Sequence, residues 1–144
     1  MKITILTGSD ELNISLERYL RFTLEVEQVL TARLGHPETL ESEMMSSDLW
    51  IAEVFNPQDP QNPEGFRTAK KLADKVPFLL LFIGDIPADF PKEGDFWLVM
   101  PSSTSLSSKI RDISNSPPPS EEDYRSLEEM WPLLGREPYH HHHR

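Results

Sequence analysis

Apolar residues gather in short continuous runs that are bounded by polar or turn-forming residues. These runs lie at residues 3–6, 26–30, 48–55, 77–83 and 96–100. Strands buried on both faces of a sheet are nearly continuously apolar, so each run predicts a buried strand. The run at 48–55 begins with Asp48 and carries one acid inside it, Glu53, where its continuous apolar part ends. A carboxylate at that place is either functional or lies just beyond the sheet.

Stripes of apolar residues at helical spacing separate the runs. They predict helices at residues 12–23, 66–73 and 106–113, and a short helix is predicted at 37–45, where Pro37 suits a first turn. Ser9 or Asp10 is the expected cap of the first of these helices. Residues 56–65 and 84–95 contain prolines that fix φ and remove N–H donors, so neither segment is expected to form a long helix or strand.

Strand and helix alternate five times along the chain, through connections too long for hairpins. The sequence therefore predicts an α/β fold in which five parallel strands are wrapped by helices on both faces, a doubly wound sheet. Ligands of such sheets bind beyond the carboxyl ends of the strands. The residues expected at those ends are Thr7, Gly8, Ser9, Asp10, Glu53, Asn56, Phe82, Ile83, Gly84, Asp85, Met100 and Pro101.

The chain changes character after residue 115. We expect residues 1–115 to form one domain, and residues 116–144 to form a Pro-rich linker, a short helix and a His-rich tail. The helix carries an apolar stripe at Tyr124, Leu127 and Trp131. Two interpretations of this stripe stay open: it packs on its own domain, or it contacts a partner protein or a second copy of the chain.

Composition narrows the classes of partner. The formal net charge is -10 and no basic stripe is found, so nucleic acid is not expected as a partner. The chain has no cysteine, which excludes disulfides and thiolate metal sites. The longest apolar run, at 76–83, is far shorter than the ~20 residues of a membrane span. A soluble cytoplasmic domain without membrane contact is expected.

In its layout the chain resembles the receiver domain of bacterial two-component response regulators, the CheY-like branch of the flavodoxin-like folds. The resemblance runs from residue 1 to about residue 114. It rests on four segments in this order: Met1-Lys-Ile-Thr-Ile-Leu, Asp48-Leu-Trp-Ile-Ala-Glu-Val, Gly65-Phe-Arg-Thr-Ala-Lys-Lys-Leu and Phe96-Trp-Leu-Val-Met-Pro. It implies strand order 2-1-3-4-5, and the chain departs from the family in a shortened fourth helix and an additional C-terminal helical tail. Such domains transfer a phosphoryl group from a histidine kinase to their own aspartate with the help of Mg²⁺.

The catalytic positions of that family are mostly replaced here. Thr7 and Gly8 stand where the family has its acidic pair, and Ser9 and Asp10 follow. Glu53 aligns with the phosphate-accepting aspartate, and Phe82 or Ile83 with the hydroxyl residue. Met100 aligns with the family's lysine. The following Pro101 is retained, at a position where receivers usually have a cis peptide bond. Trp97 aligns with the aromatic residue whose rotamer reports activation.

Phosphoryl transfer depends on positioning and on neutralising charge at the phosphoryl oxygens, so these losses together predict a degenerate pseudo-receiver. Three interpretations of Glu53 stay open: a carboxylate satisfied locally, a mimic of the negative charge of phospho-aspartate, or a remaining acceptor or metal ligand. Burial without amide donors would raise the pKa of Glu53.

The sequence thus predicts a non-catalytic, phosphorylation-independent signalling module, with a protein partner, a homodimer as one form, no cofactor and no metal site. One alternative is an active atypical phosphoreceiver that uses Glu53 with Asp10 or Asp85 around Mg²⁺ in a phosphorelay. Another is a small-ligand domain that uses the strand-end crevice. The run from His140 to His143 is either native or the remnant of a purification tag.

Overall fold

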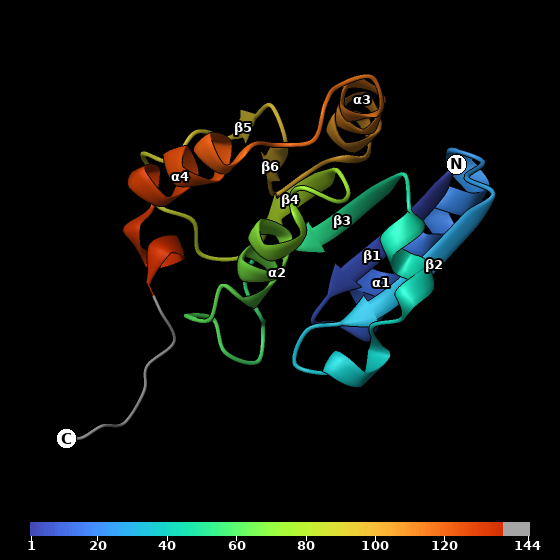
Figure 1. Cartoon of the computed structure of the whole chain (residues 1–144), viewed down its shortest axis with the longest axis horizontal. Coiled ribbons are helices and arrows are strands. Elements are labelled where there is room, and N and C mark those ends of the chain that lie inside the picture. The colour runs from blue at the N-terminus through green and yellow to red at the C-terminus, as the bar shows by residue number, and fades with distance from the viewer. Residues whose placement is uncertain (137–144) are drawn as a thin grey trace.

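The computed structural model describes residues 1–136 and has an α/β architecture built on one six-stranded sheet (Figure 1). The strands are β1 (Lys2–Thr7), β2 (Gln28–Arg33), β3 (Leu49–Glu53), β4 (Phe78–Phe82), β5 (Glu93–Gly94) and β6 (Trp97–Val99). Their order in the sheet is β2-β1-β3-β4-β6-β5. All pairs are parallel except β5 with β6. The predicted α/β class and the order of the parallel strands are confirmed.

The expectation of a purely parallel five-stranded sheet is wrong at one edge. The segment 84–95 does not only connect two strands, because its residues Glu93 and Gly94 turn back and pair antiparallel with Leu98 and Trp97. Gly94 permits this close pairing, since a Cβ at that position would lie 2.2 Å from Trp97 Nε1. A short sixth strand therefore shields the end of the sheet.

Four α-helices accompany the strands in the described chain: α1 (Asp10–Arg18), α2 (Glu64–Leu72), α3 (Ser103–Ser114) and α4 (Glu121–Met130). Ser9 caps α1 by accepting a hydrogen bond from the Leu12 N–H, as predicted. The predicted helix at 12–23 does not stay α-helical, because residues Tyr19–Thr23 form a π-helical turn. The helix predicted at 37–45 is also wrong, and two 3₁₀ turns, Pro37–Thr39 and Ser42–Ser46, stand in its place.

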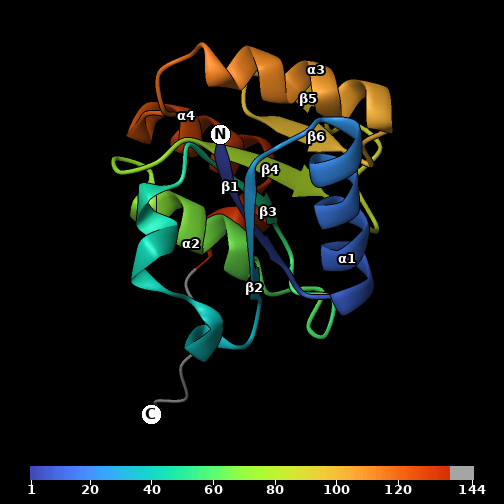
Figure 2. The ribbon, with the colours of Figure 1, turned by 90° about the vertical axis from the view of Figure 1, so that its right-hand side faces the viewer.

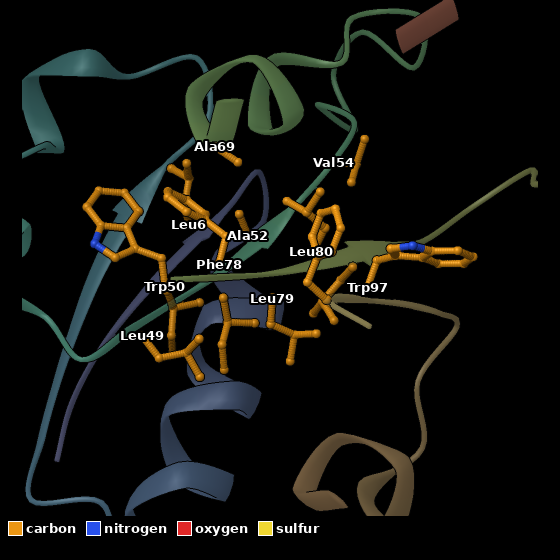
Figure 3. Close-up of a cluster of buried hydrophobic side chains, with 14 of the residues drawn as sticks. Leu6, Leu49, Trp50, Ala52, Val54, Ala69, Phe78, Leu79, Leu80 and Trp97 are labelled. Atoms are coloured by element: carbon orange, nitrogen blue, oxygen red, sulfur yellow. The ribbon is translucent and has the colours of Figure 1, made fainter. Parts of the chain in front are cut away.

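Alternate residues of the buried strands point to opposite faces of the sheet. In β4, Leu80 points toward α2, while Leu79 points away from it, toward α1 (Figure 3). Figure 2 shows α1 and α2 on opposite sides of the strands. The α1 side also holds α3, since the Tyr19 hydroxyl at the end of α1 donates to the Ser103 carbonyl over 2.6 Å. Helices thus cover both faces of the sheet, as predicted.

The fourth helix, α4, completes the α2 side. Its Tyr124 ring packs against Phe66 of α2, with ring centroids 5.7 Å apart, and against Phe96 before β6. Tyr124 and Leu127 are both buried within the chain's own core. Of the two interpretations of this stripe, packing on its own domain describes this structure, and the contact of Tyr124, Leu127 and Trp131 with a partner or a second copy stays a prediction. Residues 121–134 therefore belong to the same core as 1–115.

The histidine run predicted as a tail or tag remnant, His140 to His143, lies outside the described residues. Within residues 1–136, no helix has the length and apolarity needed to span a membrane.

Candidate functional site

Glu53 is the last residue of β3 and is 4% exposed. Its Oε1 accepts a hydrogen bond from the Gly8 backbone N–H at 2.9 Å. Burial raises the pKa of the Glu53 carboxyl, and the Gly8 hydrogen bond partly opposes that rise. The sequence placed this acid correctly at the carboxyl edge of the sheet. Its carboxylate is held by the loop after β1, as the first interpretation, local satisfaction, requires.

The Pro-rich loop after β3 covers this contact. A Cβ built on Gly8 would lie 2.2 Å from Pro57 Cδ, so the proline ring rests directly on the glycine. The loop is held closed by its own backbone: the Asn56 N–H donates to the Asn62 carbonyl at 3.0 Å, and the Asn62 N–H to the Asp59 carbonyl at 2.9 Å. The loop thereby forms a compact cover over the contact between Gly8 and Glu53.

The start of α2 lies directly against the backbone at the end of β3. Gly65 lies so near β3 that a Cβ there would stand 1.7 Å from the Glu53 carbonyl oxygen. Its N–H donates to the Val54 carbonyl at 3.0 Å. Gly65 belongs to one of the segments on which the receiver resemblance rests, and this close approach gives a structural reason for a glycine there.

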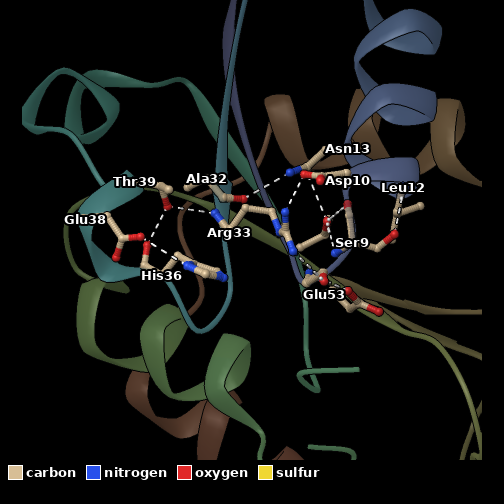
Figure 4. A network of polar contacts seen from close by, with 12 residues as sticks. Ser9, Asp10, Leu12, Asn13, Ala32, Arg33, His36, Glu38, Thr39 and Glu53 are labelled. Carbon is tan, nitrogen blue, oxygen red and sulfur yellow. Dashed lines mark hydrogen bonds and ion pairs between the residues drawn. The ribbon is translucent and has the colours of Figure 1, made fainter. Parts of the chain in front are cut away.

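The hydroxyl residues after β1 are engaged in local structure. The Thr7 side chain is fully buried, with its Oγ1 2.9 Å from Asn13 Oδ1 and 3.0 Å from the Ser9 carbonyl oxygen. Asn13 in turn donates to the Ala32 carbonyl at 3.3 Å. Ser9 serves as the cap of α1. These groups join β1, α1 and β2, and Figure 4 shows them as one polar network.

Arg33, at the carboxyl end of β2, is the charged residue of this network that sequence reasoning missed. It forms an ion pair with Asp10, and its second terminal nitrogen lies 3.4 Å from the Gly8 carbonyl oxygen. Asp10 is thus drawn toward β2 (Figure 4), and its side chain is 78% exposed. The signal was present in the sequence, but the second strand was predicted at 26–30 instead of Gln28–Arg33, so its end was misplaced.

The predicted site residues in and after β4 and β6 divide between the core and the surface. Phe82 is fully buried on the α2 side, where its ring packs on Phe90, Trp97 and Trp131. It therefore does not plug the strand-end crevice. Trp97 is 5% exposed, so at the position of the family's switch aromatic this chain has a buried core residue.

Met100, in contrast to the buried Phe82 and Trp97, is 60% exposed. Its φ is 45°, a left-handed conformation that disfavours residues with a Cβ. The peptide bond to Pro101 is trans, unlike the cis bond implied by the resemblance. Asp85, the other acid of the Mg²⁺ alternative, lies exposed in the loop after β4.

An apolar groove of about 310 Å³ lies between α1 and α3, beyond the ends of β4 and β6. Apolar side chains form its floor and walls: Leu12, Leu16, Tyr19, Leu81, Met100 and Leu106. Ser15, Ser102 and Ser103 supply hydroxyls at its margin. The groove thus offers mainly apolar contact, with few groups for polar recognition.

Metal ligands are not gathered at this edge. No group of three or more His, Asp or Glu side chains within residues 1–136 is arranged to hold an ion. Glu53 is turned to Gly8 and Asp10 to Arg33, so the two acids have different partners. The arrangement fixes loops to one another, while Met100, Asp10 and Asp85 stay exposed at the strand ends.

A scan against protein-family models matched no family, and a search of curated proteins found no match. The resemblance to receiver domains therefore rests on the residues and on the strand order.

Proposed function

We propose that this chain is a receiver-like module of the flavodoxin-like fold type that acts through protein–protein contact without phosphorylation. One observation carries the proposal: the carboxylate at the acceptor position is buried and bonded to the Gly8 N–H, beneath Pro57. A phosphoryl donor must reach an acceptor oxygen in line, and positioning of this kind supplies most of the catalysis. Here the Oε1 oxygen is already engaged by the Gly8 N–H, and the loop after β3 holds Pro57 against that glycine.

The charges around the site support the same proposal. Arg33 is the nearby cation of the network, but its guanidinium is paired with Asp10. At the position of the family's lysine, Met100 points outward and has no charge to offset a phosphoryl group. We therefore assign Glu53 a structural role, in which its carboxyl oxygen accepts the Gly8 N–H and joins the loop after β1 to β3.

The contact surface proposed for a partner is the groove between α1 and α3 together with Met100. An exposed methionine beside an apolar groove is adaptable, and such patches often mark protein interaction sites. The proposed location is the bacterial cytoplasm, in a regulatory circuit whose output protein binds this module.

Phosphorylation is tested with acetyl phosphate and Mg²⁺, followed by intact mass measurement. The proposal expects no phosphorylated species under conditions in which an active receiver domain is modified. A phosphorylated chain whose modification disappears in Glu53→Ala would establish the alternative, the atypical phosphoreceiver. Arg33 is the one observation that favours this alternative, because its cation lies at the same sheet edge.

The contact surface is tested with two matched methionines. Met100 borders the groove and Met130 projects from α4, and both are exposed, at 60% and 46%. We expect a protein retained from a lysate of the native source by the immobilised chain to be lost with Met100→Glu and kept with Met130→Glu. Equal retention by both variants would reject the groove as the binding surface.

A further inference from the structure

The side of the sheet over β4 and β6 is covered by the C-terminal segment instead of a crossover helix. The connection from β4 to β6 contains β5 and irregular chain, and no helix is found between residues 83 and 96. This leaves an aromatic surface of Phe55, Phe82, Phe90 and Phe96. Trp131 packs on the first three of these rings, with centroids 5.0, 5.5 and 5.1 Å away, and Tyr124 packs on Phe96.

The contacts that hold this segment connect it to residues far away in the sequence. Besides the aromatic contacts, Lys70 of α2 donates to both carboxylate oxygens of Glu128, each at 3.0 Å. Tyr124 and Leu127 enter the core from the same helix face. The aromatic contacts and this ion pair depend on the segment's own sequence and on residues 55–96. A segment supplied by another copy of the chain would make the same contacts.

The connection to the rest of the chain is stiff. Helix α3 ends at Ser114, and Pro117, Pro118 and Pro119 precede the cap of α4. Consecutive prolines favour an extended spacer over a chain reversal. Helix α4 has its own capping box, in which Ser120 and Asp123 bond each other's backbone N–H groups. The helix therefore begins independently of the sheet that it covers.

The packing of α4 on its own chain leaves one polar group without a hydrogen bond. The Tyr124 hydroxyl is buried and has no hydrogen-bond partner among residues 1–136. A buried hydroxyl without a partner lowers the stability of the packed state compared with the hydrated one. The packing of α4 in its own chain is thus weaker than its aromatic contacts alone would give, and release of the segment is correspondingly easier.

From these observations we propose that residues 117–135 are exchanged between two copies of the chain. In the exchanged dimer, each sheet is completed by Tyr124, Leu127 and Trp131 of the other copy. The same contacts form in monomer and dimer, so protein concentration and the linker decide between them. A short linker gives an effective concentration on the order of 1 mM. Exchange is therefore expected as the protein approaches that concentration. This inference does not rest on the proposed function, because it involves neither Glu53 nor the groove between α1 and α3.

The ion pair between Lys70 and Glu128 allows a direct test in the full chain. In Lys70→Glu, two acids oppose each other within one chain, and in Glu128→Lys, two lysines do so. When the two variants are mixed, an exchanged heterodimer pairs opposite charges at both sites. The double variant K70E/E128K restores the pair within one chain and is the matched control.

The unmodified chain, each variant alone, and an equimolar mixture of Lys70→Glu and Glu128→Lys are unfolded in urea and refolded at about 1 mM. The products are analysed by light scattering and native mass spectrometry. Because exposed ion pairs have small energies, we expect the heterodimer to be enriched about fivefold over the dimer of either variant alone. The double variant should match the unmodified chain. A mixture that refolds only to monomers would overturn the proposal. Dimers that form equally with matched and mismatched charges would also overturn it, since they would not use this contact.

Discussion

The Gly8 backbone N–H donates to Glu53 Oε1 at 2.9 Å and thereby joins the loop after β1 to the end of β3. β1 and β3 are neighbours in the sheet, and the order of strands reverses between them, the place where α/β sheets usually bind ligands. In this chain the position is occupied by an internal contact. The carboxylate still bears a desolvation penalty, and this has a measurable consequence.

Glu53→Gln should change stability in a pH-dependent way. Because burial raises the pKa of Glu53, the folded chain binds this proton more tightly than the unfolded chain does. The stabilisation from the protonated form is complete below the unfolded pKa and is lost as the pH rises through the folded pKa. Glutamine has no proton to lose, so the variant should gain stability relative to the unmodified chain as the pH rises, by about 1.4 kcal/mol per unit of pKa elevation.

Urea unfolding at acid, intermediate and neutral pH measures this difference. Asp85→Asn provides the control, since Asp85 is an exposed acid at the same edge of the sheet. A constant difference between Glu53→Gln and the unmodified chain over the whole range would show that Glu53 titrates alike in the folded and unfolded states.

Alanine at the two close-packed glycines should destabilise to different degrees. Gly8→Ala places its Cβ against the Pro57 ring, and that loop is able to move, so we expect a loss of about 1–3 kcal/mol. Gly65→Ala places its Cβ against the Glu53 carbonyl, where the buried strand cannot move, and should lose more. In denaturant titrations the double variant G8A/P57A should recover part of the Gly8 loss. No recovery would mean that Pro57 is not the obstructing group.

Much of the fold could be predicted because its main signals are local. The continuous apolar run of β4 and the helical stripe of α2 identify their elements without knowledge of the rest of the chain. The predicted bounds of β2 were wrong because they too relied on a local signal, the apolar run at 26–30. Val26 is apolar and extends the run, but its N–H bonds to the Leu20 carbonyl and ends the π-helical turn. The strand therefore begins two residues later, and Arg33 becomes its last residue.

The sequence could predict which residues form the candidate site, but not that the loop after β3 packs on it. The sequence places Glu53, Gly8 and Asp10 at one sheet edge, because the carboxyl ends of parallel strands meet there. The contact of Pro57 with Gly8 depends on how the loop between β3 and α2 folds back, and periodicity carries no information about that. The position of α4 was equally hidden. Its apolar stripe predicts a buried face, whereas the surface that receives it exists because the connection from β4 to β6 lacks a helix.

Substitutions of Tyr124 can separate the contributions of its ring and of its hydroxyl to the free energy of unfolding. Tyr124→Phe removes a buried group without a partner and keeps the contacts with Phe66 and Phe96, so the free energy of unfolding should stay equal or rise by up to about 1 kcal/mol. Tyr124→Ala empties the core and should lose about 3–5 kcal/mol. Thermal and urea unfolding measure both. A loss of more than about 1 kcal/mol in Tyr124→Phe would reveal a hydrogen bond, to protein or to trapped water.

Met100→Gly should stabilise the chain although it removes a side chain. Met100 is 60% exposed, and its side chain contributes a wall of the groove and one weak hydrogen bond, from the Gly84 N–H to its Sδ at 3.5 Å, so little contact is lost. Its φ of 45° is unfavourable for any residue with a Cβ. Relief of this strain exceeds the added backbone freedom of glycine in the unfolded chain, and we expect a gain of about 0.5–1 kcal/mol. Met130→Gly is the matched control, since Met130 is an exposed methionine with ordinary helical backbone at the last residue of α4, where glycine should lose up to about 1 kcal/mol. Urea unfolding of both variants should therefore give changes of opposite sign. Two losses of equal size would show that Met100 is held by contacts that outweigh its backbone strain.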